Sequence, residues 1–169
     1  MMLEVAVEAD AEWDSSGGWD RLVRRAAEAA IAESAFPQLG RSQRAVELSV
    51  RLTGDEAVRA LNREWRGKDR PTNVLSFPMA EADELADASS DGPELMLGDI
   101  VLARGVCLAE AADKGISVED HAAHLIVHGT LHLLGLDHGN DAQAGDMEAR
   151  EVRALAALGL GDPYAESAT

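Results

Sequence analysis

The sequence has a single cysteine, Cys107, and neither a signal peptide nor a long apolar run. One cysteine excludes an intramolecular disulfide framework, as expected in a reducing compartment, so we expect its thiol to pack as a small apolar group. The N-terminal residues lack the basic region and apolar segment of a signal peptide. No stretch of about 18 uncharged apolar residues is present to span a membrane. We therefore expect a cytoplasmic protein with no membrane partner.

Basic residues are also scarce, because 15 lysines and arginines stand against 31 acidic residues and give a formal net charge of -16. This balance favours solubility and argues against nonspecific binding to polyanions, so we expect no DNA partner. The distribution is uneven: eight of the 15 basic residues fall within residues 41 to 70, whereas residues 80 to 99 carry seven acids and no base. The pattern predicts a local basic patch on an acidic body.

Hydrophobic periodicity predicts a mixed α/β chain. At 169 residues the chain fits one domain, residues 1–169, and is long enough to build a core. Apolar residues at a period of two predict strands, and apolar residues three and four apart predict helices. The expected strands cover residues 3–7, 46–52, the end of 62–78, and 98–102, and the expected helices cover residues 19–34, 53–66, 104–114, 117–135 and 142–157.

Two of these helices begin with capping signals. Thr53 followed by Glu56 three residues later predicts a capping box, and Ser117 with Asp120 predicts the cap of the helix over 117–135. That second helix is apolar on most sides, so we expect it to be central and buried. Residues 80–94, which are rich in Asp, Glu, Ala and Ser, predict an exposed acidic loop.

Three histidines, His128, His132 and His138, fall within eleven residues of the predicted central helix and its end. Residues four apart on a helix lie one turn above each other, so the first two can reach one ion together. Gly135 can end the helix and fold the chain back, which would bring the third histidine to the same ion. Three imidazoles suit zinc and leave a fourth position open, as in catalytic sites. The alternative is that these are ordinary core or surface histidines of an amphipathic helix.

The histidine spacing also matches the zincin protease pattern H-E-x-x-H-x-x-G-x-x-H with one departure. Gly129 stands where those proteases have the glutamate that takes a proton from the zinc-bound water. The ligand frame is therefore zincin-like, whereas the catalytic base of a peptidase is missing.

Several segments together resemble the YbeY family of bacterial endoribonucleases. The resemblance covers about residues 45 to 164 and is carried by Asn62 to Pro78, Leu97 to Ile100, His124 to His138, and the Gly161-Asp162-Pro163-Tyr164 ending. It rests on the histidine motif together with the R-G-K-D-x-P-T-N-V-L-S-F-P pattern of residues 66–78, in the expected order.

The resemblance implies a metal-dependent, single-strand-preferring RNase that acts in 16S rRNA 3′-end maturation and ribosome quality control. It implies an α/β (α+β) fold, a small mixed four-stranded sheet packed with about five helices around a central metal-bearing helix. His128, His132 and His138 correspond to the ligands of one zinc ion per chain, and Arg66 corresponds to an arginine needed for activity. The implied partners are single-stranded RNA, the 16S rRNA precursor, and the ribosomal small subunit with its assembly factors.

Phosphodiester chemistry gives roles to the basic residues independently of the resemblance. Zinc lowers the pKa of bound water from about 16 to near 7 and polarises a phosphoryl oxygen. Arg66 offers a planar fork of donors to the charged oxygens of the transition state, and Lys68 and Arg70 would hold neighbouring phosphates. The alternative for these cations is a solvated loop. The attacking group is left open between water and the 2′-hydroxyl of the RNA.

Weaker candidates surround these residues. His124 lies one turn before His128, where it could contact substrate or support a ligand, whereas for His121 we favour a surface or hydrogen-bonded core role. Asp99 and Asp137 could orient ligand imidazoles through hydrogen bonds. Equally, they could cap a strand end and a turn.

Three functions remain in play. The endoribonuclease is favoured. A zinc metallopeptidase-like hydrolase fits the ligand spacing but lacks the base, and a noncatalytic ribosome-assembly factor would use zinc only to hold its fold.

Overall fold

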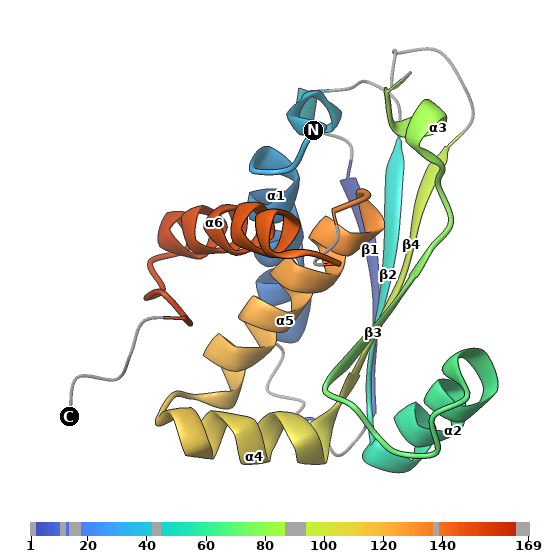
Figure 1. Ribbon diagram of the computed structural model, residues 1–169, viewed down its shortest axis with the longest axis vertical. Coiled ribbons are helices and arrows are strands. Elements are labelled where there is room, and N and C mark those ends of the chain that lie inside the picture. Colours follow the sequence, from blue (N-terminus) through green and yellow to red (C-terminus); the bar gives the residue numbers. More distant parts are fainter. Residues whose placement is uncertain are drawn as a thin grey trace.

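The computed structural model describes residues 3–10, 13, 18–41, 45–86, 94–136 and 139–164. It is a mixed four-stranded sheet with helices on both faces, which confirms the predicted fold class (Figure 1). The strand order is β1-β2-β4-β3. β1 (Leu3–Ala9), β2 (Val46–Thr53) and β4 (Leu95–Ala103) are parallel, and β3 (Val74–Pro78) pairs antiparallel with β4 at one edge.

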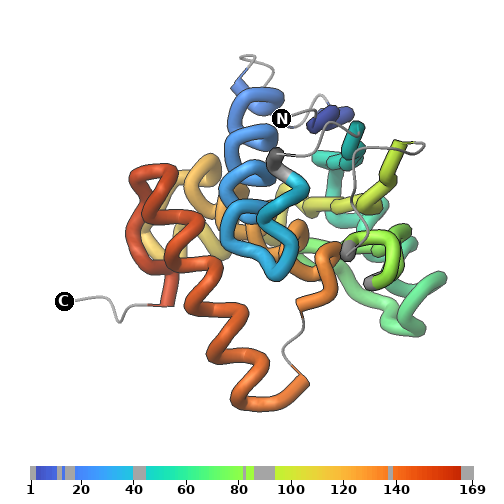
Figure 2. The backbone as a smooth tube through the Cα atoms, turned by 90° about the horizontal axis from the view of Figure 1, so that it is seen from above, coloured from blue at the N-terminus to red at the C-terminus, as the bar shows by residue number. Residues whose placement is uncertain are grey.

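The helices form unequal layers on the two faces of the sheet. Figure 1 shows α1, α5 and α6 together on one side and α2 on the other, beside one end of the strands, and Figure 2 shows the same separation from above. The bounds are α1 (Trp19–Ala32), α2 (Asp55–Arg66), α3 (Ala82–Ala86), α4 (Arg104–Lys114), α5 (Val118–Leu133) and α6 (Asp141–Ala157), with a 3-10 helix over Pro37–Arg41. The larger layer holds the main core, and α2 packs on the outer face over a smaller cluster.

The helix α5 lies between the sheet and the other helices, as its apolar composition predicts. Its Ser117 cap is also confirmed, because the Ser117 hydroxyl accepts a hydrogen bond from the Asp120 backbone N–H at 3.1 Å. Leu125, Ile126 and Leu131 are almost entirely buried in the main core. The helix thus offers a rigid support for any side chain that projects from its remaining side.

The predicted capping box at the start of α2 is wrong. Gly54 is the N-cap of this helix, without a side-chain hydrogen bond, because β2 extends through Thr53. The Thr53 hydroxyl is used in the sheet, where it donates to the Asp10 carboxylate at 2.5 Å. The preference for a hydroxyl at a cap was outweighed by a tertiary partner that the local pattern does not contain.

The predicted acidic loop over 80–94 contains the short helix α3 within its described residues. Leu85 is 1% exposed and joins the main core, so this part of the segment is anchored to the fold. Residues 87–93 lie outside the described residues. No helix of the described chain is long and apolar enough to cross a membrane.

Cys107 on α4 is completely buried, and its thiol lies 3.8 Å from the Asn73 carbonyl oxygen. Burial raises the pKa of this thiol to about 12, so the reactive thiolate is nearly absent at neutral pH. We expect the folded protein to react with a thiol reagent at pH 8 at least about tenfold more slowly than the protein in urea. A disulfide-reagent colour assay measures this. Equal rates in both states would show that the packing around α4 is looser than described.

Candidate active site

Two of the three predicted metal ligands lie one turn apart on α5. The imidazole centroids of His128 and His132 are 4.7 Å apart, and both residues line one cleft. The His128 side chain is 25% exposed, so a ligand in the cleft can reach it. His138 and Asp137 lie outside the described residues, and their roles stay predictions.

The cleft has a volume of about 580 Å³ and follows β3, an edge strand of the sheet. It is bordered by α5 on one side and by the C-terminal end of α2 on the other. Arg66, the last residue of α2, therefore lines the same cleft as His128 and His132, although these residues are far apart in the sequence. The remaining lining residues are Trp65, Thr72, Asn73, Val74, Leu75, Ser76 and Phe77.

Behind the histidines lies a buried acid that the sequence analysis missed. Glu151 on α6 is fully buried, and its carboxylate contacts His128 Nδ1 and accepts a hydrogen bond from the Tyr164 hydroxyl. A histidine that donates Nδ1–H to a carboxylate keeps the lone pair of Nε2 available for a metal. The contact between Glu151 and His128 is thus of the kind that prepares an imidazole for metal binding.

Electrostatics keep this acid ionised. Burial acts to raise the pKa of the Glu151 carboxyl, but its contacts with His124, His128 and Tyr164 outweigh this and lower the pKa to about 2. Burial and the Glu151 carboxylate raise the pKa of the Tyr164 hydroxyl, so this hydroxyl stays protonated and can donate. The network therefore holds one negative charge directly behind His128.

The structure places His124 in this network. Its Nε2 lies 3.3 Å from the Tyr164 hydroxyl oxygen and 3.6 Å from Glu151 Oε2, and the residue is 8% exposed. His121, one turn earlier, has the expected hydrogen-bonded core role, since its Nε2 lies 2.9 Å from Glu110 Oε1. Neither residue is among those that line the cleft.

The sequence held weak signals for the two missed residues. Glu151 falls in the buried stripe of α6 with Met147, Ala154 and Leu155, and a charged residue in an apolar stripe indicates a buried partner. Tyr164 belongs to the Gly161-Asp162-Pro163-Tyr164 ending, which is part of the resemblance to the YbeY family. What the sequence could not supply is the packing of α6 against α5, which joins these residues to the histidines.

The cationic loop that follows α2 is fixed by a hydrogen bond from the buried side-chain amide of Asn62. Gly67 ends the helix in a left-handed conformation with φ of 69°, which turns the chain sharply after Arg66. Asn62 is 1% exposed, and its side-chain N–H donates to the Arg70 carbonyl at 2.8 Å. Asp69 pairs with Arg59 at 2.9 Å. These contacts fix the loop at both its start and its end.

Three cations, Arg66 at the end of α2 and Lys68 and Arg70 in the following loop, have no ion-pair partner among the described residues, unlike their neighbours. Within the described chain, no carboxylate lies within ion-pair distance of Arg66, Lys68 or Arg70, whereas Arg59 and Arg63 both face Asp69. Lys68 and Arg70 line a second hollow of about 360 Å³, and Arg66 lines this hollow as well as the cleft. In a chain with a formal net charge of -16, this grouping is a local concentration of positive charge, although Glu110 also lines the second hollow.

Replacing Asn62 by alanine tests the support of this loop. We expect a stability loss of about 1–2 kcal/mol from the missing hydrogen bond. Binding of a phosphate anion by the loop should weaken because Arg66 and Arg70 lose their fixed positions. Urea unfolding and a phosphate titration measure the two effects, and an unchanged phosphate affinity would show that the loop is positioned without this amide.

Gly129 faces the sheet rather than the cleft. A Cβ atom at this position would meet the Ile100 side chain at 3.1–3.3 Å, and Ile100 is completely buried. A longer side chain here would enter the core between α5 and β4. The glycine at the position that carries the base in zincin peptidases thus packs closely on Ile100, and with no side chain there the peptidase alternative is disfavoured.

The fold separates Asp99 from the histidines. Asp99 pairs with Ser49 and Phe77 on neighbouring strands and lines a hollow on the outer face of the sheet, on the side of α2. An acidic group formed by Glu4, Glu47 and Glu94 also has its carboxylates near one another. A hydrogen bond with Glu94 is the largest cause of the raised pKa of Glu47, and burial and repulsion from the neighbouring carboxylates raise it further. Exposed acids of this kind do not identify a metal site.

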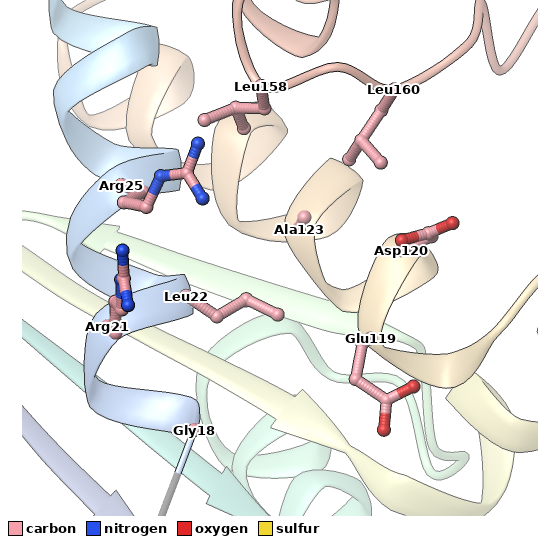
Figure 3. A pocket seen from close by; sticks show the side chains of 9 residues that line it. All are labelled: Gly18, Arg21, Leu22, Arg25, Glu119, Asp120, Ala123, Leu158 and Leu160. Atoms are coloured by element: carbon pink, nitrogen blue, oxygen red, sulfur yellow. The ribbon is translucent and has the colours of Figure 1, made fainter.

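Another hollow, of about 490 Å³, lies between α1 and the first turns of α5. Figure 3 shows Arg21 and Arg25 on one wall and Glu119 and Asp120 on the other. Opposite charges across so small an opening favour neither an anion nor a cation. We assign it no role in the activity.

Comparison with known proteins identifies the family. The family model described as Endoribonuclease YbeY matches residues 10–159. The chain belongs to the YbeY endoribonuclease family. Endoribonuclease YbeY of Rhizorhabdus wittichii is 53% identical over 166 residues, covering 97% of this chain and 98% of that protein. Endoribonuclease YbeY of Sphingopyxis alaskensis is 51% identical over 166 residues, covering 98% and 99%.

A solved structure also shares the fold with this YbeY family member. The solution structure of TM1509 from Thermotoga maritima superposes with a TM-score of 0.55 at 20% identity, covering 96% of this chain and 100% of that one. At this identity the likeness concerns the fold alone. The family assignment rests on the relatives, which are endoribonucleases by name and therefore act on RNA.

Proposed function

We propose that this protein is a zinc-dependent endoribonuclease that prefers single-stranded RNA and acts in 16S rRNA 3′-end maturation and ribosome quality control. The observation that carries the proposal is the convergence of His128, His132 and the unpaired Arg66 on one cleft. Family membership supplies the reaction class. We place the activity in the cytoplasm, with the ribosomal small subunit and its assembly factors as partners.

The residues of the cleft fit a zinc ion. His128 and His132 offer imidazole nitrogens from adjacent turns, the Glu151 contact favours a suitable tautomer of the first, and His138 is the proposed third ligand in a zincin-like frame. A bound zinc would supply Lewis-acid polarisation and a lowered pKa for water. Glutamate groups elsewhere are a poorer match for zinc than imidazole is.

The protein's own side chains account for RNA binding. Arg66 lies where it can place its guanidinium against the phosphate that enters the cleft, and its planar donors match two phosphate oxygens. Lys68 and Arg70 are positioned to hold adjacent phosphates along the second hollow. Asp99 is not part of this arrangement, and His124 acts through the Glu151 network.

Salt dependence follows from these three cations. Three phosphate contacts to a single strand give a slope of roughly -2 in a plot of log K against log salt concentration. With a formal net charge of -16, the isolated protein should bind free RNA weakly, so selectivity comes from the ribosome or an assembly factor. Filter binding at several salt concentrations measures the slope, and tight, sequence-selective binding by the isolated protein would contradict this assignment of selectivity.

Parallel cleavage assays separate the proposed function from its two alternatives. Labelled single-stranded RNA and casein are each incubated with wild type, His128→Ala and Arg66→Ala. RNA cleavage that both variants lose, with zinc lost in His128→Ala alone, supports the nuclease and its division of roles. Casein cleavage that depends on His128 would favour the peptidase. Ribosome association without RNA cleavage would favour the assembly factor.

End-group analysis of the RNA products then identifies the attacking group. A 2′,3′-cyclic phosphate would assign attack to the neighbouring 2′-hydroxyl of the RNA. If even the earliest products carry a linear terminal phosphate and no 2′,3′-cyclic phosphate, the attacking group is water.

A further inference from the structure

Trp65 is an exposed aromatic ring next to the cleft. Trp65 is 65% exposed, whereas Trp13 and Trp19 are only 2% and 8% exposed. It precedes Arg66 on the last turn of α2. A large apolar ring exposed to water at the rim of a site is a common feature of binding surfaces. The favourable free energy of burying the ring is gained only when a ligand covers it.

The ring stands between two adjoining spaces. Trp65 and Phe77 both line the cleft that contains the histidines, and both also line the hollow on the outer face of the sheet. Their ring centroids are 6.2 Å apart with an interplanar angle of 63°, an edge-to-face contact. The outer hollow has a volume of about 640 Å³, and its other apolar lining residues are Leu61, Pro78, Met79, Ile100 and Val101. Trp65 therefore borders both the cleft and the outer hollow.

Charge divides the two spaces. Arg66 lines the cleft, which has no acid among its lining residues, and Lys68 and Arg70 line the adjoining second hollow together with Glu110. The outer hollow contains Glu8 and Asp99 with a single arginine, Arg51. Phosphates are therefore drawn to the cleft side and disfavoured in the outer hollow, whereas an uncharged base is not repelled there. The outer hollow thus fits the base rather than the backbone of a nucleotide.

We propose that Trp65 is the stacking platform for one unpaired RNA base next to the phosphate held by Arg66. The inference rests on the proposed nuclease function and deepens it. Bases in a duplex are already stacked and paired, so only a single strand can turn a base onto this ring. Trp65 therefore gives the preference for single strands a physical basis in binding.

The test compares a base-bearing oligonucleotide with one that lacks bases. A fluorescently labelled 2′-O-methyl oligoadenylate and its fully abasic counterpart are titrated with wild type, Trp65→Ala, Trp65→Phe and Leu108→Ala, by anisotropy. Stacking on one aromatic ring corresponds to roughly 5- to 150-fold in affinity. We expect the ratio of the two affinities to fall by that factor in Trp65→Ala, to be largely kept in Trp65→Phe, and to be unchanged in Leu108→Ala, which alters an exposed residue of α4.

Intrinsic fluorescence and kinetics add independent readouts. Because Trp13 and Trp19 are buried, oligoadenylate should quench the emission of wild type, and Trp65→Phe should remove this quenching. Trp65→Ala should raise the KM for single-stranded RNA while changing kcat less than about threefold.

The outcomes distinguish two kinds of failure. An equal affinity ratio in wild type and Trp65→Ala, with RNA still cleaved by both, would overturn the stacking platform and leave the nuclease function standing. Absence of both oligonucleotide binding and RNA cleavage in wild type would overturn the nuclease function and the platform with it.

Discussion

Replacing Arg66 by alanine should lower kcat/KM for single-stranded RNA by about 10²–10³ without changing zinc content. Arg66 is an unpaired cation in the cleft that contains His128 and His132, so its guanidinium is available for the phosphate oxygens that gain charge in the transition state. Removing it leaves that charge without its main protein donor. Initial-rate kinetics on a labelled RNA and elemental analysis on the same preparations measure both quantities.

Two further variants make this result specific. Arg66→Lys keeps the charge but loses the planar fork, and it should recover only part of the activity. Arg21→Ala makes the same change of charge on α1, away from the cleft, and it should cleave RNA as wild type does. Equal losses in Arg21→Ala and Arg66→Ala would show that total charge, rather than a contact in the cleft, determines the rate.

Replacing Glu151 by alanine should weaken zinc binding by about 10- to 100-fold and also destabilise the protein by about 3–5 kcal/mol. The Glu151 carboxylate is fully buried and accepts hydrogen bonds from His128 and Tyr164. Its removal leaves these two donors without their acceptor, next to a cavity. Glu151→Gln keeps the volume and one acceptor, and it should lose less stability while still weakening zinc. Competition with a chromogenic chelator and urea unfolding measure the two effects.

The control for Glu151 lies on the same helix. Glu148 is exposed, and Glu148→Gln should leave zinc affinity and stability within about 0.5 kcal/mol of wild type. Unchanged zinc affinity in Glu151→Ala, measured under conditions where the variant is folded, would show that the buried acid supports the packing of α6 and not the metal.

Local sequence patterns predicted much of the fold, because buried apolar residues recur every two residues in a strand and every three to four residues in a helix. The alternation through Val46, Leu48 and Val50 matches β2, and the Ser117 cap matches the start of α5. Thr53 failed as a cap because its hydroxyl meets Asp10, a partner from a distant segment. The anchoring of α3 by Leu85 was missed because a short helix has too few apolar residues to show a period.

The candidate site also has features that local spacing predicts and features that only tertiary packing produces. The spacing of His128 and His132 on one helix face is a local property and could be predicted from the sequence. The approach of Arg66 to these histidines depends on how α2 and α5 flank β3, and residue spacing does not contain it; the family resemblance and the chemistry of phosphate binding indicated a role for Arg66 but not its place. The contact of Glu151 with His128 depends on helix packing, which residue spacing does not contain.

Zinc binding by the histidines is the claim on which the proposed chemistry depends. Elemental analysis of purified wild type and of His128→Ala, His132→Ala and His138→Ala tests it directly. We expect about one zinc per chain in wild type and its loss in each of the three variants, with circular dichroism showing that they remain folded. No bound metal in wild type, or zinc retained in all three variants, would contradict the proposed site.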